Sequence, residues 1–307
     1  QQVRVAIFPS PDVSKEYEMS RYKEKAFTTI TYTAALFSIM VLFALIYGLF
    51  REGLPLFNKV SLTEFIFSSS WYPTNAEPEF GAWTFIIGSF CVTIGALIIG
   101  IPLGLGSAIF ISEIAGNWLK EIVKPVIELL AGIPSVVYGL FGMSAIAPLI
   151  RNWLNLDTGL NIFTTSFILG LMIVPIIASM SEDALTNVPK SIREAALALG
   201  STKMECIFRV IIPAARRGIV GSILLGLGRA IGETMVVLMV AGGSAQIPKS
   251  IFDSVRPLTS TIAAEMGETV MGSLHYQSLY ALAILLFVLT FVINLITEFF
   301  LAKRDTK

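Results

Sequence analysis

The stretch Asn187–Arg217, NVPKSIREAALALGSTKMECIFRVIIPAARR, is the longest polar interruption late in an otherwise apolar chain. Ser191 and Glu194 have the S-x-x-E spacing of a capping box, which predicts a helix that begins near Ile192. Gly200 can take up the left-handed conformation that ends such a helix. A short helix is therefore expected in the first half of this stretch.

A second capping box follows at once. Thr202 and Glu205 repeat the spacing and predict another helix, which Pro213 should interrupt or bend. Two capped helices around one glycine form a compact unit, which we call the knob (residues 187–217). On geometry alone the knob is either an ordinary helical connection or a docking surface for a partner.

The residues of the knob point to one family. Glu194-Ala195-Ala196, then Gly200, then Val210-x-Ile212-Pro213 resembles the EAA loop of ABC importer permeases, which has Ile and Leu where this chain has Val210 and Ile212. In that family the loop, here about residues 182–217, is a cytoplasmic coupling helix that sits in a groove of the ATPase subunit. The resemblance implies coupling roles for Ser191, Glu194, Ala195, Ala196, Gly200 and Pro213. The capping box by itself also accounts for Glu194, so both roles stay open.

Composition places the chain among membrane proteins. Of its 307 residues 54% are hydrophobic and only 14% are charged, with a mean hydropathy of +0.75. Soluble domains carry about 25% charged residues. The 22 basic and 22 acidic residues cancel, so no polyelectrolyte partner such as a nucleic acid is implied.

Residues that carry catalysis or bind metals are scarce. Cys91 and Cys206 form neither a disulfide framework nor a metal-ligand spacing, and His275 alone cannot build a zinc site. No Walker lysine motif is present, so the chain is not expected to be an ATPase itself. We expect no catalytic residue, no metal and no cofactor.

Apolar runs predict an all-α membrane protein with six spans, both termini on one side, and polar segments at residues 1–26 and 303–307 around a permease domain at 27–302. The first span should be a retained anchor rather than a cleaved signal peptide. A short charged turn is expected at Ser112–Lys124. The expected spans are Ala26–Phe50, Trp83–Ile111, Pro125–Ile150 (broken at Gly132-Ile-Pro134 and near Pro148), Asn161–Met180, Gly218–Ala241 and Tyr276–Leu301.

Glycines in the second span have two readings. Gly100-x-x-x-Gly104-x-Gly106 is a poor phosphate-binding loop, because no strand precedes it and no Lys-Ser/Thr follows. Small residues at this spacing favour close packing of helices.

Basic residues predict the orientation. With the termini and the knob in the cytoplasm, 16 of the 22 Lys and Arg residues lie inside and five lie outside, and Arg229 lies in the membrane. The opposite orientation would invert this bias. The knob is thereby placed on the side of the membrane where ATP is available.

Arg229 and Glu233 are the candidate chemistry of the fifth span, in the stretch Gly226–Thr234, GLGRAIGET. A charge near the bilayer centre costs from about 2.5 to above 10 kcal/mol, so Arg229 should face a partner or a water-filled path. Glu233, at i+4, is expected on the same helical face within ion-pair reach. The pair either fixes helix register or lines a substrate path, and the two roles are compatible.

The guanidinium fork suits an oxyanion, because it donates bidentate hydrogen bonds to phosphate-like groups. A neighbouring carboxylate would repel a fully deprotonated anion. It could instead accept a hydrogen bond from an anion that keeps a proton, such as hydrogenphosphate. Arg229, Glu233 and Thr234 are therefore the expected lining of the path.

Several stretches together resemble the PstC-type permease of the bacterial phosphate ABC importer, which has the type I (MetI-like) importer permease fold. They are AGIPSVVYGLFG, IIASMSEDAL, RAIGETMVV and LHYQSLYALAILLFVLTFVINL. The resemblance runs from about Ala26 to Leu301. It implies a multi-pass protein of the bacterial inner membrane with these partners: a PstA-type permease, two PstB-type ATPase subunits, a PstS-type extracytoplasmic binding protein, phosphate and membrane lipid.

Alternatives remain at this point. Within the family these are the PstA-type sister subunit and a permease for another oxyanion such as sulfate or molybdate. From another class, an ion-coupled secondary transporter would show similar broken helices and a similar charge pair. The EAA-like knob and the lack of obvious inverted repeats argue against it.

Overall fold

The computed structural model describes residues 11–302, so the predicted tail at 303–307 and residues 1–10 lie outside the described part of the chain. The chain divides into two compact units, residues 1–51 and 52–307, and each is described by itself. The first unit consists of α1 (Pro11–Gly53) up to Arg51 and holds the first predicted span. Its side chains from Ala26 to Leu45 are exposed, as expected of a helix that meets lipid or a partner.

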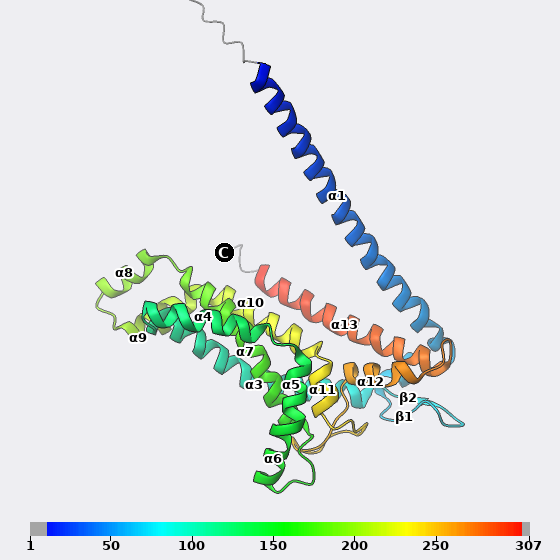
Figure 1. Ribbon diagram of the computed structural model, residues 1–307. Coiled ribbons are helices and arrows are strands. Elements are labelled where there is room, and N and C mark those ends of the chain that lie inside the picture. Colours follow the sequence, from blue (N-terminus) through cyan, green and yellow to red (C-terminus); the bar gives the residue numbers. More distant parts are fainter. Residues whose placement is uncertain (1–10, 303–307) are drawn as a thin grey trace, which may run out of the picture. The chain divides into compact units, whose positions relative to one another are not determined.

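The second unit is a bundle of helices with a small extra layer at one end (Figure 1). The extra layer contains η1 (Leu54–Asn58), α2 (Leu62–Phe67) and the hairpin β1 (Trp71–Tyr72) and β2 (Glu79–Phe80). The rest of the chain forms α3 (Trp83–Ile109), η2 (Phe110–Ile114), α4 (Asn117–Ala131), α5 (Ser135–Phe141), η3 (Gly142–Ile146), α6 (Ala147–Leu154), α7 (Ile162–Thr186), α8 (Lys190–Ala198), α9 (Lys203–Cys206), η4 (Ile207–Ile211), α10 (Ile212–Ile231), α11 (Met235–Val240), α12 (Leu258–Glu265), η5 (Met266–Glu268) and α13 (Leu274–Ala302). The all-α prediction is confirmed.

Helix α7 is the centre of the bundle, and α3 and α10 pack along it. A Cβ at Gly100 would lie 2.6 Å from the Ile173 side chain, and one at Gly104 would lie 2.8 Å from Ile177. Glycine at these two positions therefore lets α3 approach α7 closely. The close-packing prediction holds for both, whereas a Cβ at Gly106 would meet nothing within 4 Å.

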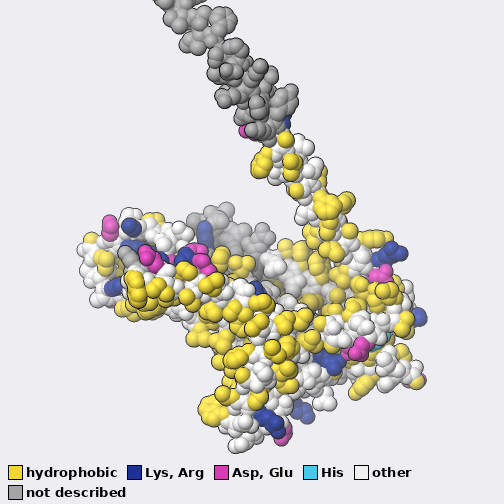
Figure 2. Space-filling view, in the orientation of Figure 1, with side chains coloured by type: hydrophobic (Ala, Val, Ile, Leu, Met, Phe, Trp, Pro, Cys, Tyr) yellow, Lys and Arg dark blue, Asp and Glu magenta, His cyan; other side chains and the backbone are white. Residues whose placement is uncertain are grey.

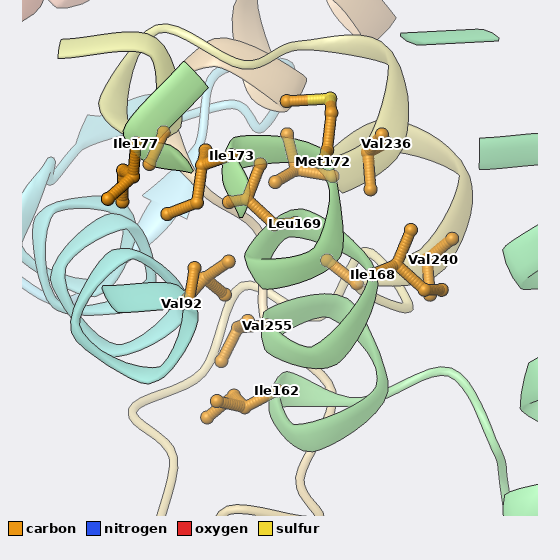
Figure 3. Packing of buried hydrophobic residues seen from close by; sticks show 14 residues of the cluster. Val92, Ile162, Ile168, Leu169, Met172, Ile173, Ile177, Val236, Val240 and Val255 are labelled. Atoms are coloured by element: carbon orange, nitrogen blue, oxygen red, sulfur yellow. The ribbon is translucent and has the colours of Figure 1, made fainter. Parts of the chain in front are cut away.

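The main core lies on the same helices. Buried side chains of α3, α7, α10 and α11 form one cluster, with Leu169, Met172 and Ile173 of α7 inside it (Figure 3). A fully buried aliphatic side chain of this kind contributes about 1.5–3 kcal/mol relative to exposure to water. The hydrophobic core of the bundle is therefore centred on α7.

The third predicted span is bent rather than straight. Helix α4 meets the α5–α6 segment at 88°, at the predicted break of Gly132-Ile-Pro134. The expected turn at Ser112–Lys124 is wrong, because the π-helical η2 and the first half of α4 occupy it. Pro148 does not end the helical run over residues 135–154, because the π-helical turn η3 directly precedes it and accommodates the missing N–H.

Five described helices are long and apolar enough to cross a membrane, and the bent pair Trp118–Ala131 with Ser135–Leu154 raises the number to six. The other spans run over Glu24–Asn58, Trp83–Ile114, Ile162–Thr186, Lys203–Ile231 and Leu274–Ile296. This agrees with the predicted six only when the bent pair is one span.

The loop between α11 and α12 is fastened to the start of α7. The backbone N–H groups of Ile162 and Phe163 donate to the carbonyls of Asp253 and Ile251, at 3.1 and 2.9 Å. The Asp253 carboxylate accepts from the backbone N–H groups of Lys249 and Ser250, and these bonds lower the pKa of Asp253. This loop is therefore ordered by its own turn and by α7.

The single histidine has a structural role. Glu265 of α12 accepts hydrogen bonds from the Trp71 indole and the Arg256 guanidinium, and its Oε2 lies 2.8 Å from His275 Nε2. These contacts join the hairpin, the loop and the start of α13. Among the described residues no group of His, Cys, Asp and Glu could hold a metal ion.

Candidate functional site

The fifth predicted span is broken at the residues singled out for chemistry. Helix α10 ends at Ile231, Gly232 is its C-cap, and α11 begins at Met235. Arg229 lies in the last turn of α10 and Glu233 lies in the break. The expectation that the two share one helical face is therefore wrong, because the helix does not continue through Gly232.

The Glu233 carboxylate serves the second helix of this pair. Its Oε1 accepts from the backbone N–H groups of Met235 and Val236, at 3.1 and 3.3 Å, and the side chain of Thr259 donates to the Glu233 carbonyl at 2.7 Å. Glu233 is only 8% exposed. It thus compensates the free N–H groups at the start of α11, as an N-cap does.

Arg229 is left without such compensation. Its Nε is buried and has no hydrogen-bond partner, and within the described part of the chain its guanidinium forms no ion pair. The predicted Arg229–Glu233 ion pair is accordingly absent from these residues. An arginine that is partly buried and unpaired is costly, which makes Arg229 a candidate for binding an anion.

Tyr138 of α5 lies close enough to Arg229 for the guanidinium charge to act on its phenol. The Tyr138 hydroxyl donates to the Leu130 carbonyl at 3.1 Å, across the bend between α4 and α5. The sequence argument missed Tyr138, although it lies in the stretch Ala131–Gly142 that resembles the permease family. A tyrosine four residues after a helix-breaking proline was the available signal.

The two breaks lie together, because α5 packs against α11. A Cβ at Gly139 would lie 2.8 Å from Met239 Sδ and 3.3 Å from the Met235 carbonyl. Gly228 and Gly232, which flank Arg229 in the sequence, are exposed, and a Cβ at Gly228 would meet nothing within 4 Å. The half-buried Arg229, the two helix breaks and the exposed glycine backbone therefore form one site. Thr234, the N-cap residue of α11, lies at its edge, with its hydroxyl 3.4 Å from the Gly232 carbonyl.

The knob forms a second candidate site, and its first helix is α8. The capping box of Ser191 and Glu194 is wrong: Pro189 is the N-cap and there is no side-chain capping bond. Proline sets the φ angle and starts the helix two residues earlier than expected. Gly200 does take the left-handed conformation, with φ +86°, so the predicted helix end is confirmed.

The second helix of the knob begins as predicted. Thr202 Oγ1 accepts from the Glu205 N–H, and the Glu205 carboxylate accepts from the Thr202 N–H, which completes the capping box. Pro213 does not end this helix. A π-helical turn, η4, precedes it, and the helical run continues from Lys203 to Ile231. The wider turn is the interruption that a proline inside a helix requires.

The outer face of the knob is exposed. Glu194, Ala195 and Leu197 lie at the surface, and Leu199 is 90% exposed. Among the described side chains none pairs with the Glu194 carboxylate. With the capping role gone, Glu194 is free to meet a partner. Figure 2 shows charged side chains of both signs gathered at the end of the bundle where α8 and α9 lie.

Ion pairs behind the knob were missed at the sequence level. Arg193 of α8 binds Glu113 of η2, and Lys120 and Lys124 of α4 both bind the buried Glu182 of α7. Glu113 and Lys120 lie in the segment assigned to a turn. The signal available was the spacing of Lys120 and Lys124, which places both on one helical face.

Comparison with known proteins now identifies the group. A family profile described as the inner membrane component of binding-protein-dependent transport systems matches residues 100–305. The chain belongs to this family. It is therefore a multi-pass membrane protein, and the ion-coupled secondary transporter class is set aside.

Individual relatives support the assignment. The chain is 41% identical over 255 residues to a probable ABC transporter permease, YqgH, of Bacillus subtilis, covering 82% of each protein. It is 33% identical over 311 residues to the phosphate transport system permease PstC of Haemophilus influenzae, covering 95% of this chain and 97% of the relative. The predicted resemblance to PstC-type permeases is confirmed.

A solved structure of a bacterial alginate ABC transporter shares the fold, with a TM-score of 0.64 at 15% identity over 93% of this chain and 98% of the other. At this identity the likeness concerns the fold alone. The predicted ABC importer permease fold is confirmed.

Proposed function

We propose that this chain is the PstC-type permease subunit of an ATP-driven phosphate importer and forms half of the translocation pathway. The unpaired Arg229 guanidinium beside two helix breaks is the observation that carries the proposal. A guanidinium with a free fork is suited to a tetrahedral oxyanion. The relatives named as phosphate transport permeases support the choice of substrate.

Glu233 fits a substrate that keeps a proton. In the described hydrogen bonds only its Oε1 is engaged, so Oε2 remains able to accept a bond from hydrogenphosphate. Sulfate carries no such proton. The same carboxylate that caps α11 thereby disfavours fully deprotonated anions. Arg229, Glu233 and Thr234 remain our proposed path residues, and Tyr138 joins them.

The knob is proposed as the docking surface for the ATPase. Exposed Leu197 and Leu199 beside small Ala195 present an apolar, closely approachable face, small Ala196 lets the inner face of α8 pack closely on the protein, and Glu194 adds an unpaired charge. Gly200 sets the angle between α8 and α9, while Ser191 and Pro213 lie at the ends of the docking segment. ATP hydrolysis is then the work of two PstB-type partner subunits.

The remaining partners follow from the same proposal. A PstA-type permease completes the pathway, and a PstS-type binding protein delivers phosphate from outside. The termini and the knob face the cytoplasm, as the bias of basic residues indicates. We retain the segments 1–26, 27–302 and 303–307 as the proposed organisation of the chain.

The test is phosphate uptake by the assembled complex carrying Arg229→Lys. Lysine keeps the charge but lacks the fork, so uptake per assembled complex should fall by about tenfold, the cost of one charge-assisted hydrogen bond. Arg151→Lys, at an exposed position on α6, is the matched control and should transport normally. Normal uptake by Arg229→Lys would refute the role of Arg229 in the path.

A further inference from the structure

Helix α8 touches the rest of the protein through very few side chains. None of its residues is buried, and only Arg193 and Ala196, three residues apart, are half-buried. Residues three apart lie on one face of a helix. The opposite face is the proposed docking surface, so apart from the chain connections at its two ends α8 is joined to the bundle by this narrow side-chain contact.

Arg193 makes most of that contact. Its Nη1 lies 2.6 Å from both carboxylate oxygens of Glu113, its Nη2 donates to the Leu185 carbonyl at 2.6 Å, and its Nε donates to the Val188 carbonyl at 3.4 Å. One guanidinium thus binds η2 at the end of α3 and also the last turn of α7 with the residues after it. The Glu113 side chain is only 7% exposed, so solvent weakens this ion pair little.

The second contact is apolar and small. Ala196 packs in the cluster formed by Cys206, Ile207 and Ile211 at the end of α3 and α7. An alanine methyl group offers little resistance to sliding or tilting. The directional part of the attachment therefore rests on Arg193, because its fork holds fixed angles to three acceptors.

The helices that Arg193 contacts extend from the knob to the proposed substrate path. Glu113 follows α3, whose other end contacts the start of α12, where the Ser89 hydroxyl accepts from the Leu258 N–H at 2.9 Å. Leu185 belongs to α7, which packs along α10 up to the break beside Arg229. A rigid connection thus joins the knob to both sides of the candidate site.

We propose that the Arg193–Glu113 ion pair is the mechanical link that transmits ATPase movement from α8 to α3 and α7. Arg193 and Glu113 act as positioning residues and do not touch phosphate. The proposal rests on the proposed importer function. It predicts that weakening the pair separates ATP hydrolysis from transport without separating the subunits.

The experiment measures phosphate transported per ATP hydrolysed by the complete importer in vesicles, for Arg193→Lys and Glu113→Gln. Each variant should bind the ATPase and hydrolyse ATP at near-normal rates while the ratio falls by roughly two- to thirtyfold. The double variant should lose no more than the worse single one, because both changes break one link. Arg209→Lys, the same change at an exposed position in the knob, is the matched control.

Two results would overturn the link. One is an unchanged ratio in assembled Arg193→Lys and Glu113→Gln complexes. The other is loss of assembly in both variants, since the pair would then only hold the fold. If Arg193→Lys alone fails to assemble, Glu113→Gln decides, because it keeps the two carbonyl bonds of Arg193. Failure of the wild-type complex to bind an ATPase or to transport phosphate would instead refute the proposed function.

Discussion

The charged residues Arg229 and Glu233, four positions apart, lie in different environments in this fold. The Glu233 carboxylate is matched by the free N–H groups of α11, whereas the Arg229 Nε is buried with no partner. A charge compensated by a helix terminus is stable in place. A charge without compensation remains available to bind, and this difference supports our proposal that Arg229 binds the anion.

At this scale we predict separable effects for Glu233. Glu233→Gln keeps a carbonyl acceptor for the α11 N–H groups, so the complex should assemble and retain some uptake. Its added N–H₂ donor and lost charge should let sulfate compete with phosphate, which is measured as inhibition of phosphate uptake by sulfate. Glu233→Ala is the comparison: it loses the cap and should destabilise the complex by about 1 kcal/mol. Unchanged sulfate competition in Glu233→Gln would contradict the proton-acceptor role.

Among the elements, short irregular turns decide what the helices can do. The π-helical turn η4 lets one helical run pass Pro213, and the bend between α4 and α5 brings Tyr138 to the break after α10. In the knob, Gly200 takes φ +86° with open space around it. Its requirement is therefore conformational rather than steric.

Two substitutions at Gly200 test whether its left-handed conformation governs docking. Gly200→Val should cost about 1–2 kcal/mol, because a side chain disfavours the left-handed region, and should misalign α8 with α9. Gly200→Asn should be nearly neutral, since asparagine tolerates this conformation. Binding of the purified permease to its ATPase, measured directly, should fall for valine and persist for asparagine. Equal binding by both variants would show that the angle at Gly200 does not govern docking.

For the second unit, hydrophobic side chains dominate the middle of the bundle in Figure 2. Charged side chains lie at the end with α8 and α9, at the tip where α6 ends and at the opposite end of the bundle. Lys190 in the knob and Ser250 in the α11–α12 loop are both exposed. Failure of a reagent to reach either one would therefore reflect the membrane and not burial in the protein.

This supports a test of the orientation. In a chain whose Cys91 and Cys206 are replaced by alanine, Ser250→Cys should react with an impermeant thiol reagent in intact cells and Lys190→Cys should not. Both should react after the cells are opened, which controls for reactivity. Labelling of Lys190→Cys from outside would reverse the orientation and remove the knob from the ATPase side.

Local chemistry determined much of this protein in advance. Apolar runs of membrane length, the left-handed Gly200, the Thr202–Glu205 capping box and the break at Gly132-Ile-Pro134 all depend on residues close in sequence, and each is present in the structure. The membrane class and the family follow from the same kind of local pattern.

Only the tertiary structure decided where the helices stop and which charges are compensated. Arg229 and Glu233 were parted because α10 ends between them. The Ser191–Glu194 spacing, by contrast, formed no capping box for a local reason, because the nearby Pro189 starts α8. The packing of segments distant in sequence brings Arg193 to Glu113 and Tyr138 close to Arg229. Spacing along a sequence fixes which residues share a helical face only while the helix is unbroken, and long-range packing energy determines where it breaks.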